Sequence, residues 1–259
     1  MKKKLTILFA LSGLVFLFAT CNRTETDCCT PGDDTGTLEL RFKGVFDDAP
    51  LMMYAASYPY EAGMSLRLQL FLFYLSDMNL VEKNGKSIKI KDIEVVNFAN
   101  IQSEVAANEG VTIRINNVPA GKYSALKTGI GVSSELNKTN PGNYSAKHPL
   151  SDNYWSAAMG YIFTKMEGNA DLDNNGSFET KLTFHIGANS LYRSKSFDKE
   201  LVINAKETTQ LDFVVDLRKL LVASEGNFLD FRKTSIDHTT NMEIASFIMN
   251  NLVNAIEVK

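Results

Sequence analysis

Polar and apolar residues alternate along several short segments of this chain, and turn signals separate these segments. Between Thr37 and Val45, the side chains of Leu38, Leu40 and Phe42 fall on one face and charged side chains on the other. This alternation is typical of a strand buried on one side. Asn84-Gly85 is a hairpin turn signal between two such segments. Further strands are predicted at residues 65–81, 87–98, 111–115, 123–132, 155–167, 178–187, 199–204 and 209–215.

Helical spacing of apolar residues occurs at the C-terminal end. The stripe there consists of Met242, Ile244, Phe247, Ile248, Leu252, Val253 and Ile256. It predicts one helix that packs on its own domain, and we expect Thr239 or Thr240 to cap its first turn. The predicted fold class is therefore mainly β, a β-sandwich with one C-terminal α-helix, forming one domain over residues 37–259.

The first twenty residues have the pattern of an export signal. Three lysines follow Met1, residues 5–20 are almost wholly apolar, and small residues precede Cys21. The apolar stretch is shorter than the roughly 20 residues of a membrane-spanning helix. We predict a lipoprotein signal peptide at 1–20 with lipidation at Cys21, an uncleaved anchor or ordinary secretion being the alternatives. The chain is then expected in the bacterial cell envelope, lipid-anchored to the outer membrane, on its periplasmic or surface face.

Residues 21–36 are rich in Thr, Asp, Pro and Gly, and predict a lipidated flexible tether. The tether carries Cys28 and Cys29, which either stay free or pair with a partner, so the domain is not expected to depend on disulfides. Without the three N-terminal lysines, 24 basic side chains remain against 30 acidic ones, a net charge of −6. This acidic balance argues against nucleic acid as a partner.

Histidine and tryptophan are scarce in this chain. The three histidines are His148, His185 and His238, and the single tryptophan is Trp155. Neutral imidazole is the commonest metal ligand and suits copper and zinc. No two of the histidines have the short spacing of a local metal motif, so a site built from them would form only on folding.

Several segments of the chain occur together in a recognisable order. The run YWSAAMGYIFTKMEG at residues 154–168 is followed by Phe184-His185-Ile186-Gly187. The other segments are Phe73 to Leu80, Gly129 to Val132, and His238 with Asn251. Together they resemble the MbnP-like copper-binding proteins, and the resemblance covers residues 37–259.

The resemblance implies a β-sandwich domain that binds copper for sequestration or delivery and is not an enzyme. In the family, two histidines and a tryptophan oxidised to kynurenine form the copper site, and a MauG-like dihaem peroxidase is implicated in the oxidation. Transferred to this chain, the metal-site residues are His185 and His238, with His148 third, and Trp155 is the residue to be oxidised.

Two other interpretations remain open. The domain could be a structural, adhesive or glycan-binding surface lipoprotein without metal. The segment from Asp171 to Gly176 resembles half of a calcium loop, but the required twelfth-position Glu is Leu182, so we interpret it as a turn. We find no catalytic motif, and interpret lone carboxylates such as Glu167 and Asp216 as structural.

Overall fold

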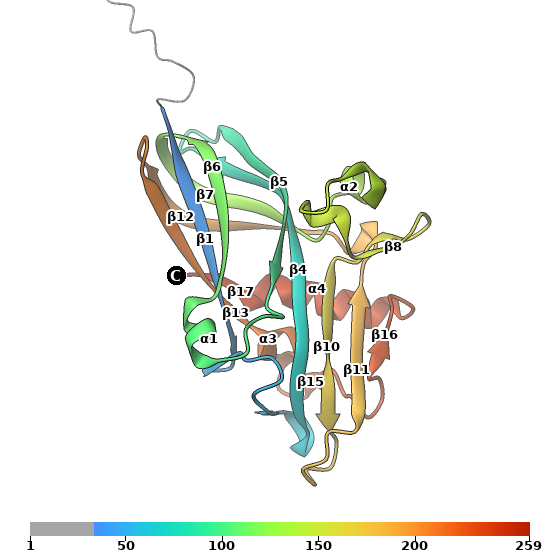
Figure 1. Ribbon diagram of the computed structural model, residues 1–259. Coiled ribbons are helices and arrows are strands. Elements are labelled where there is room, and N and C mark those ends of the chain that lie inside the picture. The colour runs from blue at the N-terminus through green and yellow to red at the C-terminus, as the bar shows by residue number, and fades with distance from the viewer. Residues whose placement is uncertain (1–33) are drawn as a thin grey trace, which may run out of the picture.

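A computed structural model describes residues 34–259 and shows two mixed sheets packed together (Figure 1). The first sheet has five strands and is mixed because its central strand pairs in parallel with one neighbour and antiparallel with another. Its strands, in order, are β17 (Ile256–Val258), β13 (Thr208–Asp216), β1 (Thr35–Phe46) and β2 (Ala49–Pro50), and β6 (Val111–Pro119) also pairs with β1.

The second sheet has eight strands, and the long strand β4 (Ser65–Val81) organises it. One half of β4 pairs with β10 and the other half with β7, while β5 lies along the opposite edge. Across the sheet the order is β12 (Arg193–Ile203), β7 (Gly121–Ile130), β4, β10 (Thr164–Asp171), β11 (Thr180–Ile186) and β16 (Ile236–Asp237), with β3 (Tyr58–Pro59) and β5 (Ser87–Asn97) also on β4. The predicted turn at Asn84-Gly85 does connect β4 to β5.

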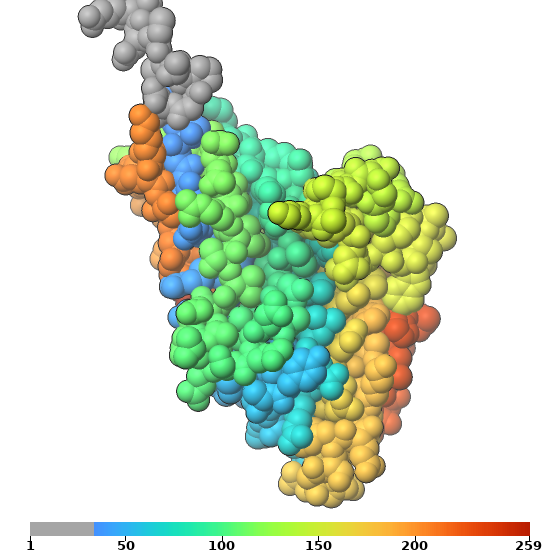
Figure 2. Space-filling view, in the orientation of Figure 1, coloured from blue at the N-terminus to red at the C-terminus, as the bar shows by residue number. Residues whose placement is uncertain are grey.

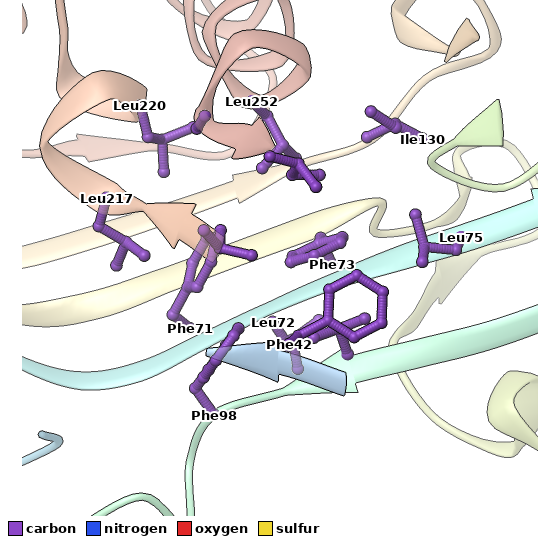
Figure 3. Close-up of a cluster of buried hydrophobic side chains, with 14 of the residues drawn as sticks. Phe42, Phe71, Leu72, Phe73, Leu75, Phe98, Ile130, Leu217, Leu220 and Leu252 are labelled. Atoms are coloured by element: carbon purple, nitrogen blue, oxygen red, sulfur yellow. The ribbon is translucent and has the colours of Figure 1, made fainter. Parts of the chain in front are cut away.

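The core lies between the two sheets and the C-terminal helices. Phe42 of β1 stacks on Phe213 of β13, with ring centroids 4.7 Å apart, and meets the edge of Phe73 of β4 at 6.2 Å. Figure 3 shows Phe42 and Phe73 in one cluster with Leu217 and Leu252 from the C-terminal helices. Alternating burial along β1 confirms that one face of this strand lies in the core.

Within residues 34–259, four α-helices cover or connect the sheets. They are α1 (Glu104–Glu109), α2 (Ser134–Asn137), α3 (Leu217–Leu221) and α4 (Met242–Ala255). Figure 1 shows α4 crossing behind β4, β10 and β11, and α4 also packs on α3. The predicted cap of α4 was wrong: Asn241 caps the helix, because its side-chain oxygen accepts from the backbone N–H groups of Glu243 and Ile244.

The single strand predicted at residues 155–167 is instead divided into three. The division produces the hairpin β8 (Tyr154–Ser156) and β9 (Gly160–Tyr161), followed by β10. The preceding segment contains α2 and the 3-10 turns η2 (Pro141–Asn143) and η3 (Pro149–Ser151). Figure 2 shows this segment in olive and yellow-green, as a lobe beside the sheets.

Four short elements remain. They are η1 (Glu61–Gly63), η4 (Asn189–Leu191), and the paired strands β14 (Val222–Ser224) and β15 (Asn227–Phe228). The prediction of a mainly β fold with packed sheets and a C-terminal helix is confirmed. Among residues 34–259, no helix combines the length and apolar character needed to cross a bilayer.

Some predictions concern residues that the structure does not describe. The signal peptide at 1–20, the lipidation site Cys21 and the cysteines Cys28 and Cys29 lie outside the described residues. Most of the predicted tether, residues 21–36, lies outside them too, and its last two residues are already part of β1.

Candidate metal centre

A parallel strand pair places His185 beside His238. In the eight-stranded sheet, β11 pairs in parallel with β16, Thr183 lying opposite Ile236 and Phe184 opposite Asp237. The next position on each segment is a histidine, and both histidines therefore emerge on the same face. Their ring centroids are 5.0 Å apart and the rings are nearly perpendicular, at 78°. Two imidazoles separated by more than fifty positions in the sequence thus become neighbours.

Hydrogen bonds hold the His238 loop against the end of β11. The Thr239 hydroxyl donates to the backbone carbonyl of His185 at 3.1 Å and accepts from the Gly187 N–H at 3.0 Å. Thr239 therefore bridges the two segments instead of capping α4, and its φ is +59°. On the other side of His238, Asp237 Oδ1 accepts from the backbone N–H groups of Thr240 and Asn241 and from the Thr240 hydroxyl.

The β8–β9 hairpin presents Trp155 to these two rings. Its base is fixed by Asn137 of α2, whose Oδ1 accepts from the Tyr161 N–H at 2.7 Å. Gly160 packs against the same Asn137 side chain: a Cβ at Gly160 would lie 2.3 Å from Asn137 Oδ1, and its φ of +74° favours glycine. Tyr161 is buried while Trp155 remains 41% exposed, so the hairpin anchors one aromatic ring and leaves the other at the surface.

The rings of Trp155, His185 and His238 form one cluster, which we call the aromatic triad. The Trp155 centroid lies 5.2 Å from that of His238 and 6.1 Å from that of His185. Imidazole nitrogens carry lone pairs that bind metals, but the indole N–H only donates. As encoded, the triad therefore offers two potential ligands, and its tryptophan would become a ligand only after chemical change.

The environment of the triad favours the metal-binding form of its histidines. Burial lowers the pKa of His185, and the positive charge of Lys165 and the ring of His238 lower it further, although the hydrogen bond to Glu167 and its negative charge act in the opposite direction. Burial therefore favours the neutral form of His185, which is the form that binds metals. Within the described part of the chain, the buried Nδ1 of His238 has no hydrogen-bond partner, so this nitrogen is not engaged by any other group of the protein.

The third predicted histidine lies in a different environment. His148 stacks on Tyr144 with ring centroids 4.0 Å apart, and its Nδ1 accepts from the Leu150 N–H at 3.1 Å. Its electrostatic neighbours are charged residues of β5. The structure thus brings Trp155, His185 and His238 together and gives His148 a local role in its loop.

Comparison of the sequence with protein-family models gives a match. The sequence model of the MbnP family matches residues 35–245, well over half of the chain. The chain belongs to the MbnP family. This confirms the resemblance seen in the sequence motifs. The solved structure of MbnP from Methylosinus trichosporium is 16% identical to this chain, covers 72% of this chain and 77% of its own, and has a TM-score of 0.48. No curated protein matches the chain.

One residue beside the aromatic triad was not predicted as a site residue. Glu167 was interpreted as structural, yet its Oε1 lies 2.7 Å from His185 Nε2. Among residues 34–259, no three or more His, Cys, Asp or Glu side chains form a group that could hold a metal ion.

The segment that resembles half of a calcium loop forms a turn in the structure. The Asp171 carboxyl accepts hydrogen bonds from the backbone N–H groups of Asp173, Asn175 and Gly176.

Proposed function

We propose that this MbnP-family chain binds copper at the aromatic triad and sequesters or delivers the ion, without acting as an enzyme. The observation that carries the proposal is the 5.0 Å separation of the His185 and His238 rings. At that distance two imidazoles can direct lone pairs at one ion between or beside them. Their arrangement depends on strand pairing and on the Thr239 bridge, so the site is held by the fold.

The chemistry of the site suits copper as cargo. Copper binds imidazole in preference to carboxylate, and it lies at the top of the Irving–Williams order for nitrogen ligands. Burial lowers the pKa of His185 and so favours its neutral form, and Nδ1 of His238 lacks the hydrogen bond that a buried imidazole usually makes. A bound copper ion would satisfy this nitrogen. Trp155 at the open side of the site stays accessible to a partner protein.

Anchoring at the membrane completes the proposed role. The signal pattern before Cys21 supports lipidation there, with the domain held at the outer membrane. Each buried CH₂ of an acyl chain contributes about 0.8 kcal/mol, so two or three chains give stable attachment. A protein held in this way would capture copper in the envelope without losing it by diffusion of the carrier.

Removing both imidazoles is expected to abolish copper binding. The full-length protein is isolated from its native host as the wild type and as the double variant His185→Ala, His238→Ala, and its copper is measured by elemental analysis. We expect near-equimolar copper in the wild type and at most a trace in the double variant, because both imidazole ligands are then absent. His148→Ala is the matched control and should retain copper.

Equal copper in the wild type and the double variant would contradict the proposal. A surface lipoprotein of structural, adhesive or glycan-binding type would then be the better interpretation. Circular dichroism of the double variant shows whether the sheets are retained, which separates loss of ligands from loss of the fold.

We also propose that Trp155 is converted to kynurenine by a partner dihaem peroxidase of the MauG type. Two molecules of hydrogen peroxide each supply one oxygen atom and leave as water. The two atoms add across the C2–C3 bond of the indole, that bond breaks, and the resulting N-formylkynurenine is hydrolysed to kynurenine and formate. The product carries an aromatic amine with a free lone pair, so a third ligand arises beside His238, where the Trp155 ring lies 5.2 Å away.

The conversion exchanges one carbon atom of the side chain for one oxygen atom, which intact-mass spectrometry resolves. We expect this mass change when the protein is produced together with the peroxidase, and the unmodified mass when it is produced alone. Trp155→Phe is the control and should keep its unmodified mass in both cases. An unmodified wild type in the presence of active peroxidase would contradict this step while leaving two-histidine binding to be judged by its own test.

A further inference from the structure

Glu167 lies beside the aromatic triad and contacts His185. It is on β10, where Lys165 pairs opposite His185 and Glu167 pairs opposite Thr183 on β11. Residues two apart on a strand share a face, so Glu167 and His185 are diagonal neighbours on the same side of the sheet. Glu167 Oε1 lies 2.7 Å from His185 Nε2, and both side chains are largely shielded from solvent, 33% and 16% exposed.

The contact has a consequence for the His185 ring. A carboxylate has acceptors but no donor, so the nitrogen that faces it must carry a hydrogen. In a neutral imidazole only one nitrogen is protonated, and the other has a free lone pair. Because Nε2 donates to Glu167, the lone pair lies on Nδ1. Histidines that bind metals commonly donate their other N–H to a carboxylate, which fixes both the tautomer and the ring orientation.

We infer that Glu167 is a positioning residue that holds His185 as the Nε2–H tautomer and thereby makes Nδ1 the atom of His185 that binds the metal ion. The inference rests on the proposed function for the identity of the ion. The negative charge of Glu167 also offsets the positive charge of Lys165, which lies opposite His185 and would oppose a bound cation. Glu167 therefore acts through the ring without being a ligand.

The tautomer is testable in the full-length protein without metal. With ¹⁵N-labelled histidine, the two ring nitrogens of His185 give different chemical shifts according to which one is protonated. We expect a protonated Nε2 in the wild type and a loss of this preference in Glu167→Ala. Glu167→Gln should keep the tautomer, because its amide oxygen still accepts from Nε2–H. Glu179→Ala, at an exposed glutamate before β11, is the control and should match the wild type.

The second measurement is Cu(I) affinity, obtained by competition with a chromophoric chelator. Loss of a carboxylate that supports a ligating histidine typically reduces metal affinity about 10–100-fold, and we expect this for Glu167→Ala. Glu167→Gln should fall between Glu167→Ala and the wild type. In the copper-loaded wild type, the ¹⁵N shift of Nδ1, and not that of Nε2, should change on binding.

The outcomes separate this inference from the proposed function. A wild type that carries the proton on Nδ1, or a tautomer unaffected by Glu167→Ala, would overturn the inference even if copper binds. If no form of the protein binds Cu(I) while the tautomer depends on Glu167, the positioning role is supported and the proposed function fails. Coordination through Nε2 in the loaded protein would also overturn the assignment of Nδ1.

Discussion

Replacing Phe42 with alanine is expected to lower the free energy of unfolding by about 3–5 kcal/mol. Phe42 is 1% exposed and connects the two sheets, because its ring stacks on Phe213 in its own sheet and meets the edge of Phe73 in the other. Alanine would remove both aromatic contacts and leave a cavity between sheets that are fixed by their own hydrogen bonds. Such a site relaxes little, so the cost should lie near the upper end of the range.

Urea denaturation followed by circular dichroism measures this cost. Phe178→Ala is the matched control, since Phe178 is only half-buried near the tip of the β10–β11 hairpin and contacts the Arg67 guanidinium at 4.0 Å from its ring centroid. We expect a loss of about 1 kcal/mol there. A similar decrease in the free energy of unfolding for the two variants would contradict the placement of Phe42 in a core shared by the two sheets.

The sheets could be predicted from the sequence because their pattern is local. Alternation along residues 37–45 places one face of β1 in the core, and the long apolar run from Ser65 to Val81 corresponds to β4. The irregular segment around Trp155 could not be predicted in the same way. Residues 155–167 were predicted as one strand, whereas the turn at residues 157–159 reverses the chain into the β8–β9 hairpin, where Gly160 packs on Asn137.

The site depends on features that are not local. The family resemblance grouped His185, His238 and Trp155 into one site, but neither periodicity nor spacing in the sequence shows why they become adjacent. That adjacency comes from the parallel pairing of β11 with the two-residue strand β16, which no periodicity reveals in so short a segment. Parallel pairing between distant segments has no tight turn that fixes its register. Local sequence patterns therefore do not predict which residues of β11 and β16 lie opposite one another.

Glu167 illustrates the same limit on a smaller scale. A two-residue turn at Asn175-Gly176 would pair His185 with Met166, whereas the structure pairs His185 with Lys165. A shift of one residue moves every side chain of a strand to the other face. The contact between Glu167 and His185 therefore depends on a register that the turn signal alone misplaces by one position.

Replacing Asp237 with alanine is expected to lower the free energy of unfolding by about 2–3 kcal/mol and to displace His238 from the aromatic triad. Asp237 is 2% exposed, and its Oδ1 accepts three hydrogen bonds, from the Thr240 N–H, the Thr240 hydroxyl and the Asn241 N–H. Each such bond contributes about 1 kcal/mol, and donors left buried without an acceptor cost more. The same bonds shape the loop between β16 and α4, so losing them frees the segment that carries His238.

Two measurements on one variant separate these effects. Urea denaturation gives the stability, and the fluorescence of Trp155, the single tryptophan, reports on the ring contacts at the triad. We expect Asp237→Ala to change the emission of the folded protein, because the Trp155 ring lies 5.2 Å from His238 and an imidazole at that distance affects the excited indole. Asp48→Ala, at an exposed aspartate between β1 and β2, should change neither quantity. A destabilised variant with unchanged emission would mean that Asp237 supports α4 alone, and that the Thr239 bridge to β11 is sufficient to hold His238 in place.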